Sequence, residues 1–370
     1  MSINESTGMY PIKNRHRDYL METLALASER RGFCAPNPSV GAVVVKDGVV
    51  LARGRHWAAG WPHAEVEALK DLGGSVRGAT LYVSLEPCCH WGKTPPCTER
   101  IMASGIREVY YAWQDPNPKV AGKGAEVLNQ AGISCELIPL AEAESFYESY
   151  AYWVQHQRPL ITAKLAMSLD GKIAGPQGLT VLLTGETLRY HTHSWRKRSD
   201  AILTTINTLM NDDPQLNVRL AGEVVPKPVY VLDSQLQLPK TARILTTAAT
   251  LTLFHAEKVD SKRVRDWVAA GVHCKAVPAT SQGLDLMAIL NALGQDGWHD
   301  VWVEVGGRAF QAFLQQRLLH RAFFYIAPIL LGEQALSAFS APIPLLENAI
   351  HRQWRAMGED GLYELEFAVD

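Results

Sequence analysis

The feature that most constrains this chain is a cysteine-rich loop, LEPCCHWGKTPPC, at residues 85–97. Three of the six cysteines lie in it, namely Cys88, Cys89 and Cys97. The first twenty residues are polar and lack the apolar core of a secretion signal, so we expect a cytoplasmic location. Disulfides are rare there, and clustered cysteines more often bind metal or act in catalysis. The remaining three, Cys34, Cys135 and Cys274, are predicted to be small buried apolar residues.

A histidine and a glutamate precede this loop in a pattern that suits zinc. His63-Ala64-Glu65 follows Pro62 at the start of a predicted helix, and the loop follows a predicted strand over 80–85. One imidazole and two thiolates leave a fourth zinc position open to water, as in catalytic sites. Glu65 is then placed to carry protons. His63 and Glu65 can face one ion only if His63 lies at the edge of the first turn, because residues two apart on a helix point in different directions.

Other interpretations of the cluster remain open from the residues alone. A structural zinc would need a fourth protein ligand, which Cys89 or His90 could supply, although adjacent cysteines can hardly both reach one ion. A Cys88–Cys97 disulfide is disfavoured by the expected compartment. Simple packing is a further alternative. For Cys89 itself we predict a buried neighbour of the site, while His90 could be loop scaffolding or a substrate contact.

Length and charge narrow the class of protein. A chain of 370 residues is long enough for about two domains. The formal net charge of −2 and a sequence pI near 6.6 argue against a nucleic-acid or anionic-membrane partner. No apolar window approaches the ~18 residues of a membrane span. Local basic residues can still bind a small phosphate.

The order of predicted elements indicates an α/β architecture. Strands and helices alternate through both halves of the chain. Aromatic residues crowd a helix end near residue 150, and Pro159 then opens a new strand. We therefore predict a first domain over 1–156 and a second over 157–370.

The first half resembles a known family. HAEVEAL and LEPCCHWGKTPPC, flanked by PNPSVG and DPNPKVAGKG, resemble the deaminase half of bacterial bifunctional riboflavin-biosynthesis proteins. Zinc deaminases commonly place two residues between the cysteines, whereas eight separate Cys88 from Cys97 here. The resemblance implies a cytidine-deaminase-like three-layer domain. It assigns His63, Cys88 and Cys97 as zinc ligands and Glu65 as proton shuttle, and treats Cys89 as a non-ligand.

The second half resembles the reductase half of the same family. No G-x-G-x-x-G fingerprint follows an early strand, so a Rossmann domain is not supported. Instead KLAMSLDGKIA, NDDPQLNVR, VLDS and VEVGG occur in the family's order. The resemblance implies a dihydrofolate-reductase-like domain that uses NADPH. The implied cofactor contacts are Met167, Thr208, Asp212, Ser234, Gly306, Gly307, Arg308, Ala309, Phe310, Gln311 and Ala312. The implied substrate contacts are Thr180, Arg196, Leu216, Arg219 and Glu304.

One position departs from the family pattern. Leu182 stands where a tryptophan is often found, which puts that cofactor contact in doubt. The Gly306-Gly307 turn, between a predicted strand and helix, would let backbone N–H groups approach a phosphate.

Several side chains have two possible roles that the sequence does not distinguish. Arg196 and Arg219 suit a ribosyl phosphate because guanidinium binds phosphate bidentately, but Arg196 could equally lie on a solvated helix face. Asn37 could read a pyrimidine edge or cap its own turn. Lys164 is costly to bury unpaired and is predicted to hydrogen-bond the sugar or to assist protonation during ring opening. Lys93 and Thr94 could contact phosphate or solvent, and Asp170 is predicted to form a turn.

These observations predict two fused enzymes. The first would remove the 2-amino group of a diaminopyrimidinone that bears a ribosylamino 5-phosphate, and the second would reduce the ribosyl group to ribityl. A zinc deaminase of another base, nucleoside or tRNA with an unrelated second domain is the main alternative. A binding protein with a structural zinc is a third. We also expect a homo-oligomer, with a dimer favoured.

Overall fold

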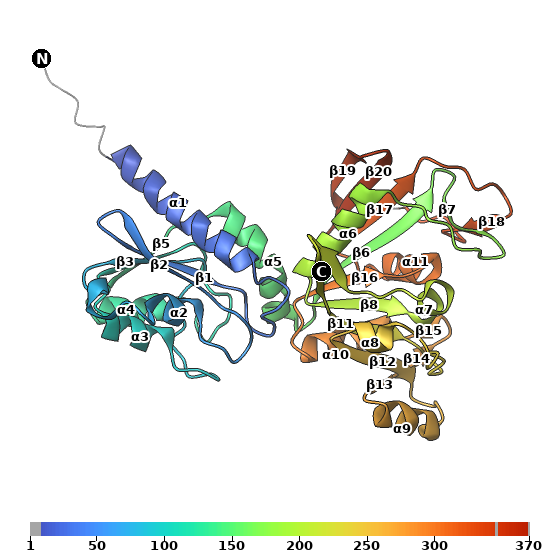
Figure 1. Cartoon of the computed structure of the whole chain (residues 1–370), viewed down its shortest axis with the longest axis horizontal. Coiled ribbons are helices and arrows are strands. Elements are labelled where there is room, and N and C mark those ends of the chain that lie inside the picture. The colour runs from blue at the N-terminus through green and yellow to red at the C-terminus, as the bar shows by residue number, and fades with distance from the viewer. Residues whose placement is uncertain (1–8, 345–346, 369–370) are drawn as a thin grey trace, which may run out of the picture. The chain divides into compact units, whose positions relative to one another are not determined.

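The computed structural model describes residues 9–344 and 347–368. The chain divides into two compact units at the His156/Gln157 junction. No helix of the described residues is both long and apolar enough to cross a membrane. Figure 1 shows both units.

The N-terminal unit contains one five-stranded sheet with the order β2-β1-β3-β4-β5. Strands β2 and β3 both pair antiparallel with β1, one on each side, and β3, β4 and β5 are parallel. The strands are β1 (Gly41–Lys46), β2 (Val49–Arg55), β3 (Thr80–Val83), β4 (Glu108–Tyr111) and β5 (Ser134–Leu137). The helices are α1 (Met9–Ser28), α2 (Ala64–Leu69), the 3-10 turn η1 (Gly73–Val76), α3 (Cys97–Ser104), α4 (Lys123–Gln130) and α5 (Ala141–His156).

Helices cover both faces of this sheet, as Figure 1 shows. Alternate residues of β1 point to opposite sides, so Val44 packs with α2, α3 and α4, whereas Val43 packs with α1 and α5. Helix α2 lies unusually close to β2, because a Cβ on Gly54 would lie 2.1 Å from the Ala64 carbonyl oxygen. The three-layer architecture expected for this half is confirmed.

The C-terminal unit is built on a nine-stranded sheet with the order β13-β12-β11-β8-β16-β6-β17-β20-β19. The first seven strands of that order are parallel, and β20 and β19 are antiparallel additions. These strands are β6 (Leu160–Ser168), β8 (Ala201–Thr205), β11 (Pro228–Leu232), β12 (Thr250–Ala256), β13 (His273–Val277), β16 (Asp300–Glu304), β17 (Arg321–Ala327), β19 (Ala349–Met357) and β20 (Asp360–Phe367).

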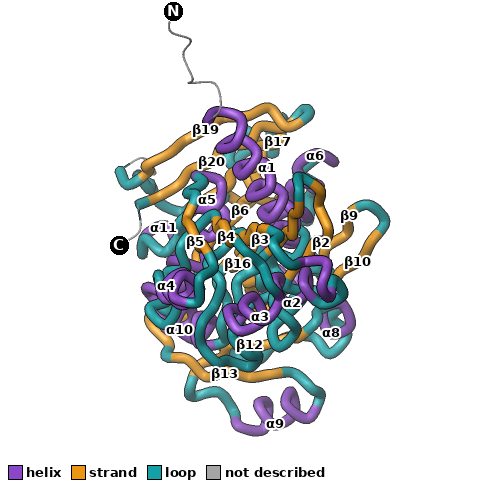
Figure 2. Tube along the Cα trace, turned by 90° about the vertical axis from the view of Figure 1, so that its left-hand side faces the viewer, coloured by secondary structure: helices purple, strands orange, loops and turns teal. Residues whose placement is uncertain are grey.

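Short ribbons and helices complete the unit. The ribbons pair β7 (Lys172–Pro176) with β18 (Ala335–Ser337), β9 (Val218–Leu220) with β10 (Glu223–Val225), and β14 (Ala279–Thr280) with β15 (Gly283–Leu284). The helices are α6 (Glu186–Arg198), α7 (Ile206–Asp212), α8 (Ile244–Thr247), α9 (Ser261–Ala269), α10 (Leu286–Gln295) and α11 (Gly307–Gln315). Helices α10 and α11 pack on one face of the sheet, and α6 to α9 pack on the other. Figure 2 shows β19 and β20 as a long hairpin.

The parallel arrangement decides where the second site can form. Strands β6, β8, β11 and β16 all end at the same edge of the sheet. In open α/β sheets ligands bind beyond the carboxyl ends of such strands. The predicted α/β class is thus observed in both units.

Candidate active sites

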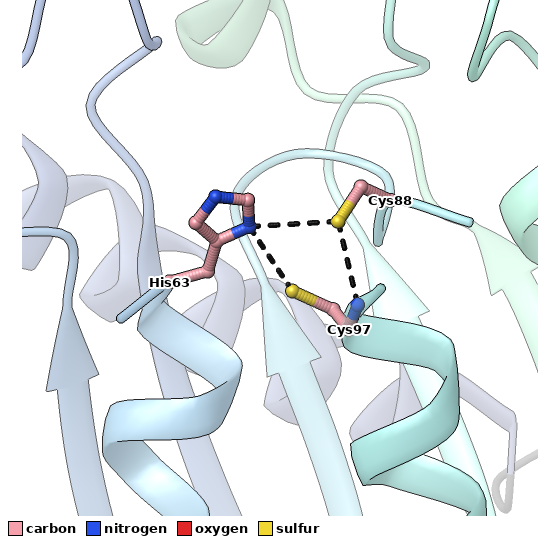
Figure 3. A group of neighbouring side chains, drawn as sticks. All are labelled: His63, Cys88 and Cys97. Carbon is pink, nitrogen blue, oxygen red and sulfur yellow. Dashed lines mark hydrogen bonds between the residues drawn. The ribbon is translucent and has the colours of Figure 1, made fainter. Parts of the chain in front are cut away.

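Three side chains of the N-terminal unit converge as a metal-binding group. His63, Cys88 and Cys97 offer ligand atoms that all lie within 4.8 Å of one another. Nδ1 of His63 lies 3.2 Å from the Cys97 sulfur and 3.5 Å from the Cys88 sulfur, as Figure 3 shows. The imidazole-and-two-thiolate donor set suits zinc.

Local structure explains this convergence. His63 is the N-cap of α2, with an extended backbone at φ −69° and ψ 163°. That position at the helix edge satisfies the condition under which His63 and Glu65 can face one ion. Cys97 is the first residue of α3, and its backbone N–H donates to the Cys88 sulfur at 3.4 Å.

The electrostatics of the cluster favour a thiolate. The pKa of Cys88 is lowered to about 4, because hydrogen bonds from Cys97 and His63 stabilise its ionised form despite burial. The pKa of Cys97 is raised by the same hydrogen bond and by burial. A thiolate is the form of cysteine that binds metal.

Glu65 is buried beside the three ligands, with 3% of its surface exposed. Burial, and secondarily the charge of Cys88, raise its pKa to about 7. A carboxyl group that titrates near neutral pH can both accept and release a proton, which is what a general acid–base catalyst needs.

The alternatives for the cysteine loop do not fit this geometry. All six cysteines are free, so the Cys88–Cys97 disulfide does not form. Within the described residues, the metal-binding group that includes His63 has three members and no fourth protein ligand. Cys89 is half-buried, rather than buried as predicted, and its sulfur lies 3.9 Å from the Lys119 carbonyl oxygen. Nδ1 of His90 is buried without a hydrogen-bond partner in the described part of the chain.

Thr94 contacts the far side of the histidine ring. Its hydroxyl lies 3.3 Å from Nε2 of His63, so it holds the ring with Nδ1 toward the sulfurs. We predict that Thr94→Val weakens zinc affinity by ~10–100-fold, measured by competition with a chromophoric chelator. Lys93→Ala is the matched control, because Lys93 is exposed and no metal contact depends on it. Equal zinc affinity in the Thr94 variant and the control would contradict this role.

Asn37 is connected to the same cluster by a second histidine, to which it is hydrogen-bonded. Its amide nitrogen is 3.1 Å from Nε2 of His56, and Nδ1 of His56 lies 3.0 Å from the Pro62 carbonyl oxygen. Because the Pro62 carbonyl oxygen can only accept, Nδ1 of His56 carries the proton. In the neutral ring Nε2 is then the acceptor, and the Asn37 amide donates to it. Burial lowers the pKa of His56, which keeps this ring neutral. The ring centres of His56 and His63 are 5.2 Å apart.

The predicted cofactor residues of the C-terminal unit gather at the carboxyl edge of its sheet. Met167 lies near the end of β6, Thr208 lies in the first turn of α7 after β8, and Ser234 follows β11. Gly306 is the N-cap of α11, which follows β16 and contains the rest of the segment to Ala312. A Cβ on Gly307 would lie 1.8 Å from the Ala338 carbonyl oxygen, so only glycine fits there.

A buried charge cluster lies on the opposite side of β16 from α11. Nε and Nη2 of Arg196 lie 2.5 and 3.0 Å from the two carboxylate oxygens of Glu304. Nζ of Lys164 lies 3.8 Å from the same carboxylate. Burial opposes ionisation, but Arg196 and then Lys164 outweigh it and lower the Glu304 pKa to about 2. The solvated-face interpretation of Arg196 is therefore wrong, since its residue is 7% exposed.

The remaining predicted contacts are distributed around this edge. The Thr180 hydroxyl donates to Asp212 at 3.1 Å, which brings a predicted substrate contact to a predicted cofactor contact. Arg219 is exposed, and its guanidinium donates to Gln215 and Asn217. Leu216 is buried, whereas Leu182 is 75% exposed. Asp170 accepts from the backbone of Leu331 and Gly332, as suits the predicted turn.

Sequence reasoning did not single out several residues that support these sites. Trp302, buried in β16, donates to Glu304 at 2.8 Å. Half-buried His191 and buried Tyr325 form a further hydrogen-bonded pair. Glu86 of the LEPC motif accepts from the backbone N–H groups of Gly122 and Gly124 at the start of α4. Glu86 could have been found from its position within a recognised motif. No local pattern in the sequence marked Trp302, His191 or Tyr325.

Burial of His191 should make the C-terminal unit sensitive to acid. Burial, followed by the charges of Arg355 and Arg198, lowers its pKa from 6.5 to about 4. The neutral form is favoured in the fold, so stability is complete above pH ~6.5 and falls as the pH drops toward 4. We predict that His191 contributes about 2 kcal/mol to the stability lost between pH 7.5 and pH 5.0, so that His191→Asn loses that much less than the wild type in urea unfolding at the two pH values. His193, whose pKa burial likewise lowers to about 4, contributes to the loss in both proteins. Parallel pH profiles of the two proteins would contradict this assignment.

Comparisons with known proteins match both units. Residues 14–113 match the cytidine and deoxycytidylate deaminase zinc-binding region, and residues 159–361 match the RibD C-terminal domain. The riboflavin biosynthesis protein RibD of Aquifex aeolicus is 36% identical over 360 residues, which cover 94% of this chain and 98% of that protein. The Escherichia coli RibD is 37% identical over 337 residues, covering 88% and 90% of the two chains.

A solved structure extends the similarity to the fold. The Acinetobacter baumannii RibD structure matches 96% of this chain and 100% of its own at 33% identity, with a TM-score of 0.84. These matches span both units in one order and at nearly full length. The chain therefore belongs to the RibD family of riboflavin biosynthesis proteins, and it is a bifunctional enzyme with a zinc-dependent deaminase unit and an NADPH-dependent reductase unit.

Proposed function

We propose that the two units act in sequence on one phosphorylated pyrimidine. The first hydrolyses the 2-amino group of 2,5-diamino-6-(5-phosphoribosylamino)pyrimidin-4(3H)-one, and the second reduces the ribosyl group of the product to ribityl. A Thermotoga maritima structure, 31% identical over 96% of this chain with a TM-score of 0.81, is titled a diaminohydroxyphosphoribosylaminopyrimidine deaminase/5-amino-6-(5-phosphoribosylamino)uracil reductase. The observation that carries the proposal is the His63, Cys88 and Cys97 group with Glu65 buried beside it.

In the deaminase unit, His63, Cys88 and Cys97 would hold the zinc. Bound zinc lowers the pKa of water from about 15.7 to about 7 and so supplies a nucleophile at neutral pH. As the water oxygen adds to the ring carbon that bears the amino group, Glu65 accepts a proton from it and passes that proton to the adjacent ring nitrogen. Glu65 then takes the proton of the added hydroxyl and delivers it to the amino nitrogen, so the C–N bond breaks, ammonia leaves and the carbonyl forms. The Glu65 pKa of about 7 supports both transfers.

Asn37 is proposed to orient the pyrimidine. The hydrogen bond to His56 sets which way its amide points. An amide both donates and accepts, and thus matches a pyrimidine edge that presents the complementary pair.

In the reductase unit, Met167, Thr208, Asp212, Ser234 and the segment from Gly306 to Ala312 are proposed to bind NADPH, which supplies the hydride. Thr180, Leu216, Arg219 and Glu304 are proposed to contact the substrate. Arg219 has an exposed guanidinium beside the edge where these residues gather, so we assign it the phosphate. Arg196 is still proposed to contact the substrate, and it would do so while ion-paired with Glu304. Lys164 is proposed to assist protonation of the sugar ring oxygen as the C1′–oxygen bond breaks and the ring opens.

The proposal is tested by assaying both steps on one preparation. We expect zinc in the purified protein, ammonia release from the diaminopyrimidine, and NADPH oxidation only when the deaminated product is supplied. Cytidine and guanine are the matched control substrates and should release no ammonia. Comparable turnover of cytidine would favour the nucleoside-deaminase alternative, and oxidation of NADH at the same rate as NADPH would overturn the cofactor assignment.

Self-association is also proposed. Strand β19 is an edge strand, and most of its residues are exposed on both faces. Exposed edge strands offer unpaired backbone groups to a second chain. A dimer is the expected species in light scattering, and a monomer at micromolar concentration would contradict it.

A further inference from the structure

The carboxylate of Glu304 is held by more donors than its ion pairs provide. Its Oε1 accepts from Nε of Arg196 at 2.5 Å and from the indole Nε1 of Trp302 at 2.8 Å. Its Oε2 accepts from Nη2 of Arg196 at 3.0 Å and lies 3.8 Å from Lys164. Trp302 is fully buried, so no water competes for its N–H. The indole therefore sets the rotation of a carboxylate that the proposed function places against the substrate.

Strand geometry explains why these groups meet. Trp302 and Glu304 are two residues apart on β16 and point to the same face. Lys164 is directly opposite Glu304 on β6, and Tyr325 lies on the next strand, β17. Helix α6 packs on this face and contributes His191, Trp195 and Arg196.

Beyond Trp302 the contacts form a closed belt back to Lys164. The ring of Trp302 stacks on Trp195, with centroids 5.6 Å apart and planes 19° apart. The indole of Trp195 donates to Nε2 of His191 at 3.1 Å. Nδ1 of His191 must then hold the proton, and it donates to the Tyr325 hydroxyl at 2.6 Å. The Tyr325 ring centre lies 6.0 Å from Nζ of Lys164.

We infer that Trp302 is a positioning residue of the reductase site, and that the Trp195–His191–Tyr325 belt supports it by fixing Lys164 beside Glu304. None of these four residues needs to touch the substrate, because Glu304 and Lys164 would transmit their effect. The inference rests on the proposed function, since it concerns how the reductase recognises its phosphorylated aminouracil substrate.

The test compares two tryptophan-to-phenylalanine variants of the whole chain. Trp302→Phe keeps an aromatic ring and removes the N–H that Glu304 accepts. Trp298→Phe is the matched control, because its indole donates to the Tyr230 hydroxyl at 2.7 Å in the same unit, outside the belt. For Trp302→Phe we expect KM for the aminouracil substrate to rise by about 10–100-fold, as loss of a hydrogen bond to a charged group implies. The NADPH Kd, measured by calorimetry, should stay within about twofold, and ammonia release should not change.

Tyr325→Phe provides a second variant if Trp302→Phe does not fold. It removes only the hydroxyl that His191 contacts, and we expect a smaller rise in KM with an unchanged NADPH Kd. The inference is overturned if the control and Trp302→Phe give the same KM, if KM in Tyr325→Phe equals that of the wild type, or if NADPH binding weakens in parallel with KM. Failure of the wild-type protein to reduce the aminouracil would instead refute the proposed function.

Discussion

Deamination should fall by about 10²–10⁴-fold in Glu65→Gln, while the zinc content of the protein stays that of the wild type. The physical reason is that glutamine keeps the size and polarity of the side chain but cannot accept a proton. His63, Cys88 and Cys97 retain their positions, so metal binding does not depend on the replaced group. The measurement is ammonia release from the diaminopyrimidine, with elemental analysis of the same sample.

Glu67→Gln is the matched control for this prediction. Glu67 lies on the same helix and pairs with the exposed Lys70 rather than with the metal-binding group. NADPH-dependent reduction should be unchanged in both variants, because it belongs to the other unit. Persistence of deamination in Glu65→Gln would contradict the proposed mechanism. Loss of zinc would indicate a structural role for this carboxylate.

Glu304→Gln should destabilise the reductase unit by about 3–5 kcal/mol and abolish reduction. Removing one partner of a buried ion pair leaves the other charge uncompensated, which here is Arg196, with Lys164 nearby. The Glu304 pKa of about 2 shows how strongly these cations favour the ionised carboxylate. Hydrogen exchange of peptides from β6 and β16 under native conditions measures the effect within this unit alone.

Lys275→Gln is the control for Glu304→Gln. The Lys275–Asp296 pair is about one-third exposed on the lysine side, and pairs of that kind contribute about 0–1 kcal/mol. Equal protection of β6 and β16 in the two variants would contradict the importance of the buried pair. Deaminase activity should survive in both.

Much of the deaminase site could be predicted from the sequence, because its chemistry is concentrated in short motifs. His63 and Glu65 are separated by one residue, and both cysteines lie in one loop. A helix start after Pro62 and a loop after a strand are local features, and they determine where these side chains are presented. The resemblance to a family then selected Cys88 and Cys97 from the possible ligand pairs. The roles assigned to these residues stay predictions until the variants are assayed.

Less of the reductase site could be predicted from the sequence. Its cofactor contacts were carried over by resemblance, and no periodicity indicated that Met167, Thr208 and Ser234 share one edge. That proximity depends on a strand order in which β16 lies between β8 and β6, although it starts 95 residues after β8 ends and 132 residues after β6 ends. Arg196 illustrates the difficulty, since its neighbours Lys197 and Arg198 make a charge run that is also typical of a solvated helix face.

The amino-acid sequence by itself determined the alternation of strands and helices, the division near residue 156 into candidate domains, and the zinc-type motif, because each depends on residues close together in the chain. Tertiary structure alone decided that Arg196 is buried against Glu304, that Trp302 donates to this carboxylate, and that His191 pairs with Tyr325 on the same face of the sheet. The reason is that burial and charge pairing are properties of non-local contacts. Residues 108 positions apart become partners only when the parallel sheet places β16 beside β6 and beneath α6.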